Sequence, residues 1–159
     1  MLTVCEDTAQ GEPMAELEIR PVADVDLEAI AEIDEKIGGR YRPEVWEQRV
    51  GYYLRRDPEA SHVALVGGKV VGFMLGEVRS GEFGLEEPTG WIEVLGVDPD
   101  ARRMAVGRKL AEALLDHFRG KGATSVRTLV DEKMEGIGGF FASLGFEPAP
   151  VQPFVLKLQ

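Results

Sequence analysis

The sequence has little cysteine and little histidine. Cys5 is its one cysteine, and His62 and His117 are its two histidines among 159 residues. A single cysteine cannot form a disulfide within the chain, so we expect a protein of the reducing cytoplasm and not a disulfide-stabilised secreted domain. Neither histidine has a partner at the spacing of a metal site, so no metal is expected.

Long hydrophobic runs and a surplus of basic residues are also lacking. No apolar stretch approaches the roughly 20 residues that span a bilayer, and the acidic start of the chain does not resemble a secretory signal. No membrane partner is therefore expected. The 18 Lys and Arg residues against 28 Asp and Glu residues give a net charge of −10, which argues against a nucleic-acid partner because phosphates attract a basic surface. An acidic surface suits a cationic substrate such as an amine, although it also serves solubility.

Hydrophobic residues make up 44% of the chain, a globular composition. Residues 1–14 are predicted to be a tail, and residues 15–159 to form a single domain. Apolar periodicity and turn residues predict four helices, over 27–38, 43–54, 106–119 and 135–144. They predict strands over 18–22, 62–66, 70–78, 91–97 and 124–130, with one or two more after residue 146. A hairpin followed by a strand–helix–strand unit implies a mixed sheet, hence an α/β (α+β mixed sheet) fold in three α-β-α layers.

The most informative segment runs from Val97 to Leu110 and reads VDPDARRMAVGRKL. It joins a strand end to a helix start, where unpaired N–H groups and a partial positive charge attract anions. The small residues Ala105 and Gly107 allow the backbone to approach a phosphate. Four basic residues form an island in an acidic chain: Arg102, Arg103, Arg108 and Lys109. A diphosphate ligand accounts for this pattern, and an ordinary amphipathic helix is the alternative. Neither the nucleotide P-loop pattern nor the dinucleotide fingerprint is present.

This segment resembles the acetyl-CoA signature of the GNAT superfamily of N-acetyltransferases, V-x-P-x-x-[RQ]-x-x-[GA]-x-[GA]. The positions of that signature are occupied, in order, by Val97, Pro99, Arg102, Ala105 and Gly107. A second stretch is similar to the family's V-x(10)-Y-x-x-L-G-F, with Val130, Phe141, Leu144, Gly145 and Phe146. The resemblance extends over about residues 18–158. It implies the GNAT fold with a splayed pair of parallel strands, and acetyl-CoA as the cosubstrate.

In that family the strand before the loop holds the pantetheine arm through backbone hydrogen bonds, and the loop holds the pyrophosphate. The cofactor-binding residues that the resemblance implies are Leu95, Gly96, Val97, Arg102, Arg103, Met104, Ala105, Val106, Gly107, Arg108 and Phe141. For the three strand residues, an ordinary core strand is the alternative.

Acetyl transfer to an amine requires that an ammonium group with a pKa of about 10.4 loses a proton. Glu93 is the candidate base, because it interrupts an apolar strand where a charge is costly. GNAT enzymes frequently carry a glutamate on this strand. Burial would raise the pKa of its carboxyl into a useful range; an outward-facing glutamate is the alternative. The backbone N–H of Leu95 is the candidate to polarise the thioester carbonyl.

Phe141 departs from the family pattern, because it replaces the tyrosine that commonly protonates the leaving thiolate. Two functions therefore stay open. The first is an N-acetyltransferase that moves acetyl from acetyl-CoA to a primary amine, of a small molecule or a protein, by direct attack in a ternary complex. The second is a non-catalytic acyl-CoA-binding module that acts as a sensor or binds a partner. Dimers are frequent in the family, so a homodimer is expected by analogy.

Overall fold

The computed structural model describes residues 16–84, 86–134 and 136–159, so the predicted tail lies outside the described residues. The chain forms two compact units, one that ends at Thr128 and one that runs from Leu129 to Gln159. In the described residues no helix is both long and apolar enough to cross a membrane.

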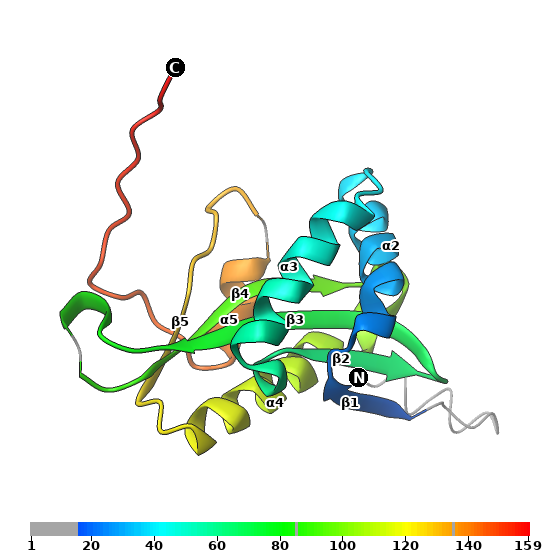
Figure 1. Cartoon of the computed structure of the whole chain (residues 1–159), viewed down its shortest axis with the longest axis horizontal. Coiled ribbons are helices and arrows are strands. Elements are labelled where there is room, and N and C mark those ends of the chain that lie inside the picture. The colour runs from blue at the N-terminus through cyan, green and yellow to red at the C-terminus, as the bar shows by residue number, and fades with distance from the viewer. Residues whose placement is uncertain (1–15, 85, 135) are drawn as a thin grey trace. The chain divides into compact units, whose positions relative to one another are not determined.

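The first unit contains one mixed sheet (Figure 1). Its strands are adjacent in chain order: β1 (Leu17–Pro21), β2 (His62–Val66), β3 (Lys69–Arg79), β4 (Thr89–Val97) and β5 (Ser125–Thr128). The first four pair antiparallel, and β5 pairs parallel with β4. Gly67 and Gly68, at φ of 59° and 78°, form the hairpin turn between β2 and β3, as a two-residue turn with positive φ at both positions requires. The predicted mixed sheet is confirmed.

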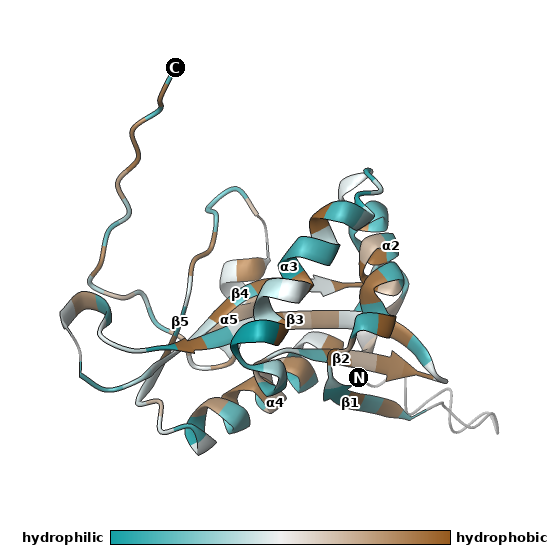
Figure 2. Cartoon of the chain, viewed as in Figure 1, coloured by the Kyte–Doolittle hydropathy of each residue, from teal (hydrophilic) through white to brown (hydrophobic). Residues whose placement is uncertain are grey.

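Three helices cover the two faces of this sheet. Helices α2 (Leu27–Gly38) and α3 (Pro43–Arg56) bury apolar side chains against one face. This core includes the following residues: Ile30, Ile33, Trp46, Val50, Val63, Leu65, Phe73 and Leu75. Helix α4 (Val106–Gly120) covers the other face. Its fully buried side chains Val106, Leu110, Leu114 and Phe118 recur at helical spacing. Figure 2 shows hydrophobic colouring along β2, β3 and β4, as a sheet covered on both faces requires.

Glycines let α4 approach the sheet closely. A Cβ atom at Gly72 would lie 2.6 Å from Val106 Cγ1, and one at Gly90 would lie 2.5 Å from the Phe118 ring. Larger side chains at these strand positions would therefore push the helix away. Because Gly72 has no side chain, the start of α4 packs directly against β3.

The second unit contains α5 (Ile137–Ser143) and an extended segment after it. Phe141 is buried, and its ring centroid lies 5.1 Å from those of Phe140 and Phe146. The predicted strands after residue 146 are wrong, because residues 146–159 contain no strand. Phe154 is 92% exposed there. Three prolines in this stretch supply no N–H donor, and a strand forms only where a neighbouring edge pairs with it.

Candidate functional site

The parallel pair β4–β5 separates part-way along β4. Pairing joins Thr89–Ile92 to Ser125–Thr128 and goes no further, although β4 continues to Val97. Within the described residues, the segment from Glu93 to Val97 has no strand beside it on the β5 side. Its backbone N–H and C=O groups on that edge are therefore available to a ligand, as unpaired strand edges are. The splayed pair that the resemblance implied is present.

A β-bulge lies at the point of separation. Leu75 pairs with Val94 and Gly76 pairs with Ile92, so Glu93 has no opposite residue on β3. A bulge bends its strand and redirects the side chain of the extra residue. Glu93 is thereby turned away from the regular alternation of β4, towards the side chain of Arg79 on β3.

The loop after β4 is anchored by the buried Asp98. Its backbone N–H donates to the Val71 carbonyl at 2.7 Å, and its Oδ1 accepts the N–H of Asp100 at 3.0 Å. Its Oδ2 accepts a hydrogen bond from Lys36 Nζ of α2 at 2.8 Å. Burial by itself raises the pKa of Asp98, but the bonds from Lys36 and from the Asp100 N–H outweigh it and lower that pKa below its ordinary value. The carboxylate is therefore charged at neutral pH and ties the loop to α2, while the backbone N–H of Asp98 ties the loop to β3.

The loop leads through a 3-10 turn, Pro99–Met104, into α4. Ala105 precedes the helix with φ 57° and ψ 27°, a left-handed conformation that costs a residue other than glycine about 1–2 kcal/mol. Lys109 N–H donates to the Ala105 carbonyl at 3.1 Å, which is the first bond of the helix. The first N–H groups of an α-helix have no acceptor within the helix itself. Together with the exposed side chains of Arg102 and Arg108, this geometry favours an anion.

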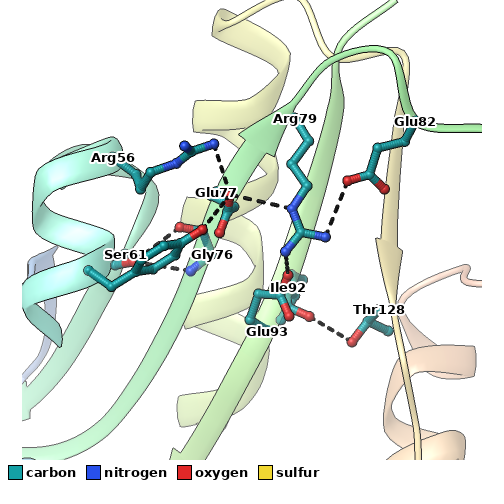
Figure 3. Close-up of polar contacts among 10 residues, drawn as sticks. Arg56, Ser61, Gly76, Glu77, Arg79, Glu82, Ile92, Glu93 and Thr128 are labelled. Atoms are coloured by element: carbon teal, nitrogen blue, oxygen red, sulfur yellow. Dashed lines mark hydrogen bonds and ion pairs between the residues drawn. The ribbon is translucent and has the colours of Figure 1, made fainter. Parts of the chain in front are cut away.

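A network of charged side chains lies on the α3 side of the sheet beside the bulge (Figure 3). Glu77 of β3 is only 1% exposed. Its Oε1 lies 3.3 Å from each of three groups, Tyr52 OH, Arg56 Nη2 and Arg79 Nε. Arg79 also contacts Glu82 at 3.3 Å and forms an ion pair with Glu93. Its guanidinium carbon lies 4.9 Å from the centre of the Trp91 ring. One guanidinium therefore joins three carboxylates above an aromatic face.

The sequence interpretation missed Glu77 and Arg79. The signal that selected Glu93 applies equally to Glu77, which interrupts the apolar run VVGFMLGEV. Glu93 itself departs from expectation, because its side chain is 25% exposed and paired with Arg79, where burial was expected. Tyr53 of α3 is buried beside these charges. Burial first, and then the charge of Glu93, raise the pKa of Tyr53 to about 12, so its phenol keeps its proton at neutral pH.

The first unit thus brings most of the predicted site residues into one continuous stretch. Glu93, Leu95, Gly96 and Val97 lie along the unpaired part of β4, and Arg102 to Arg108 follow in the loop and the first turn of α4. Phe141 belongs to the second unit. In the part of the chain that the structure describes, no group of three or more His, Cys, Asp or Glu residues could hold a metal ion.

A sequence profile of the acetyltransferase (GNAT) family matches residues 27–146. The chain belongs to this GNAT family. A mycothiol acetyltransferase of Thermobispora bispora is 37% identical over 90 residues, which cover 57% of this chain and 30% of that protein. The mycothiol acetyltransferase of Stackebrandtia nassauensis is 30% identical over 148 residues, which cover 86% of this chain and 46% of that protein. The chain therefore spans less than half the length of these relatives.

A solved structure shares the fold of this chain. The aminoglycoside N-acetyltransferase AAC(6')-Iy, in complex with CoA, superposes with a TM-score of 0.77 over 90% of this chain and 95% of that chain. The sequences are 21% identical. The GNAT fold expected from the two motifs is confirmed.

Proposed function

We propose that the chain is an N-acetyltransferase that moves acetyl from acetyl-CoA to a primary amine by direct attack in a ternary complex. Its membership of the GNAT family supports this reaction class. The observation that carries the proposal is the unpaired edge of β4, which runs without interruption into the N-terminus of α4 and has a carboxylate at its bulge. Such an arrangement offers backbone hydrogen-bond partners to an extended ligand. It also offers an anion site at the N-terminus of α4 and a proton acceptor at the bulge of β4.

The residues present fit acetyl-CoA. We assign the backbone of Leu95, Gly96 and Val97 to the pantetheine arm, because peptide-like amides pair with an open strand edge. The N–H groups at the start of α4, with Arg102 and Arg108, would hold the pyrophosphate. Acetyl-CoA supplies an activated thioester. Phe141 is assigned to the same ligand by resemblance alone.

Glu93 is proposed as the proton acceptor. An acceptor amine arrives as an ammonium ion and must lose a proton before its nitrogen can attack. The Glu93 carboxylate takes that proton, and the Leu95 N–H stabilises the oxyanion that forms on the thioester carbonyl. A thiol with a pKa of about 8.5 is a tolerable leaving group without assistance, so the replacement of the usual tyrosine by Phe141 is compatible with turnover. Much of the rate would come from holding the amine and the thioester in contact.

Ligand binding can be tested by thermal unfolding with and without acetyl-CoA. A ligand at about a hundred times its dissociation constant stabilises by roughly 2.7 kcal/mol, which is a rise of about 5–10 °C in Tm for a domain of this size. Gly107→Trp fills the first turn of α4 and should abolish the shift. Gly120→Trp, at the open far end of the same helix, should keep it. A well-folded wild type without any shift would refute the proposal.

Turnover is tested with a panel of primary amines. Glu93→Gln keeps the size of the side chain and removes its basicity, so kcat should fall by about 10²–10³ while the KM for acetyl-CoA is unchanged. Glu47→Gln, an exposed change of the same kind on α3, is the control. Binding of acetyl-CoA without turnover of any amine would instead favour a non-catalytic acyl-CoA module.

Three expectations about partners and location stay predictions. The net charge of −10 favours a protein that does not bind nucleic acid. Residence in the cytoplasm is expected because the single cysteine, Cys5, suits a reducing compartment. Assembly as a homodimer is expected by analogy with the family. Sedimentation of the purified chain would measure whether it forms a homodimer.

A further inference from the structure

Glu77 is a buried carboxylate that the proposed reaction does not use. It is 1% exposed, and in the described structure its Oε2 has no hydrogen-bond partner. An ionised oxygen that has left water without gaining a partner is unfavourable. Such a group marks a position at which a hydrogen-bond donor can bind.

The partners that Glu77 does have are held loosely. Tyr52, Arg56 and Arg79 all approach the same oxygen, Oε1, at 3.3 Å. Charge-assisted hydrogen bonds of good geometry are shorter, at about 2.7–2.9 Å. The side chains of Arg56 and Arg79 are 52% and 31% exposed, so both guanidinium groups can move into solvent. These partners are therefore replaceable.

Arg79 marks a position that suits a cation. Its guanidinium contacts Glu77 through Nε, Glu82 through Nη1 and Glu93 through Nη2, and it lies above the Trp91 ring. Carboxylates and an aromatic face are the groups that bind ammonium ions in proteins. With Arg56 included, two cations face three carboxylates. The network keeps a net negative charge, which favours a ligand that brings a further positive charge.

We propose that Glu77 determines acceptor specificity and that the acceptor is a diamine, a dication that displaces the guanidinium of Arg79. One ammonium group binds between Glu77 and the Trp91 ring and stays protonated. The other gives its proton to Glu93, which the departure of Arg79 has left unpaired, and the resulting amine attacks the thioester. The C–N bond forms and the C–S bond breaks. The proton that the attacking nitrogen loses as it becomes the amide passes to the departing thiolate, so CoA leaves as the thiol. This inference depends on the proposed acetyl transfer for its chemistry.

The wild-type protein tests the inference directly. Acetylation is measured at saturating acetyl-CoA with terminal diamines from diaminopropane to diaminohexane and with the monoamine of each length. At least one diamine should exceed its monoamine by about tenfold or more in kcat/KM. The matching amino alcohol should behave as the monoamine does. A series in which no diamine is preferred would overturn the inference, and so would an amino alcohol as good as the diamine, because the site would then recognise a neutral donor.

Three variants separate this inference from the reaction itself. Glu77→Gln should bring the ratio of diamine to monoamine kcat/KM close to one, whereas Glu47→Gln on the exposed side of α3 should leave that ratio as in the wild type. Arg79→Gln should lower the KM for the diamine by about threefold or more, because the internal cation no longer competes. A higher KM in that variant would show that Arg79 only supports the fold, and the inference would be wrong.

Failure of the two proposals is distinguishable. If Glu93→Gln abolishes turnover of diamines and monoamines alike while Glu77→Gln changes neither, the reaction stands and the diamine site falls. If Glu77→Gln does not fold, the wild-type panel and Arg79→Gln still decide, because neither experiment requires that variant.

Discussion

The methyl group added by Gly76→Ala would collide with the backbone of the neighbouring strand. An ideal Cβ at this position lies 2.4 Å from the carbonyl oxygen of Trp91, and also 3.1 Å from Phe118 Cζ and 3.3 Å from Leu114 Cδ2. The side chains can yield by a few tenths of an ångström, but the carbonyl belongs to the β3–β4 ladder and cannot move alone. We therefore expect β4 to shift at the bulge.

The expected cost is about 2–3 kcal/mol, the upper part of the range for overpacked cores. For a domain of this size the loss corresponds to a fall of about 4–12 °C in Tm. Since Gly76 pairs with Ile92, next to the bulged Glu93, kcat for any accepted amine should fall by at least about tenfold in the protein that remains folded. Thermal unfolding followed by circular dichroism measures the first quantity, and a thiol-release assay the second.

Gly120→Ala is the matched control for this prediction. It adds the same methyl group at the end of α4, where a Cβ would meet nothing within 4 Å. Alanine is the better helix former, so the variant should be neutral or up to about 1 kcal/mol more stable. If Gly76→Ala unfolds at the same temperature as the wild type, β3 and β4 do not approach closely at the bulge. The placement of Glu93 at that bulge would then be wrong as well.

Two further predictions concern the loop before α4. Because the folded-state pKa of Asp98 is lowered, its contribution to stability is present above the unfolded pKa of about 3.9 and is lost as pH falls through the folded value. Asp98→Asn should therefore be less stable than the wild type at neutral pH, and the difference should shrink below about pH 4 in a series of urea titrations; a constant difference would contradict the bond to Lys36. Ala105→Gly removes the cost of about 1–2 kcal/mol that a left-handed conformation imposes on alanine. Glycine also raises the conformational entropy of the unfolded chain, which lowers stability by about 0.5–1 kcal/mol, so a small net gain of stability is expected. A clear loss in a denaturant titration would show that Ala105 is not strained.

Local patterns were sufficient for the helices, for the hairpin and for the loop before α4. The Gly67-Gly68 turn specifies a tight hairpin by itself, since only glycine enters positive φ at no cost. The apolar stripe of α4 predicts a helix over 106–119, within one residue of the observed end, because burial of one face requires that spacing. Pro99, Arg102 and Gly107 lie in one short segment, so local backbone geometry is enough to bring them close together in space.

The surroundings of Glu93 depend on contacts that no local pattern contains. Tyr52 and Arg56 come from α3, Glu77 and Arg79 from β3, and Glu93 from β4; only the pairing of β3 with β4 and the packing of α3 on the sheet bring them together. The same dependence explains the wrong prediction of strands after residue 146, since apolar alternation forms a strand only where another edge offers hydrogen bonds. By itself the sequence determined the helices, the hairpin, the family and the loop before α4, because those follow from short-range geometry. The tertiary structure alone decided where β4 leaves β5, that a bulge redirects Glu93, and that Arg79 lies between three carboxylates, because each of these results from the register of strands far apart in the chain.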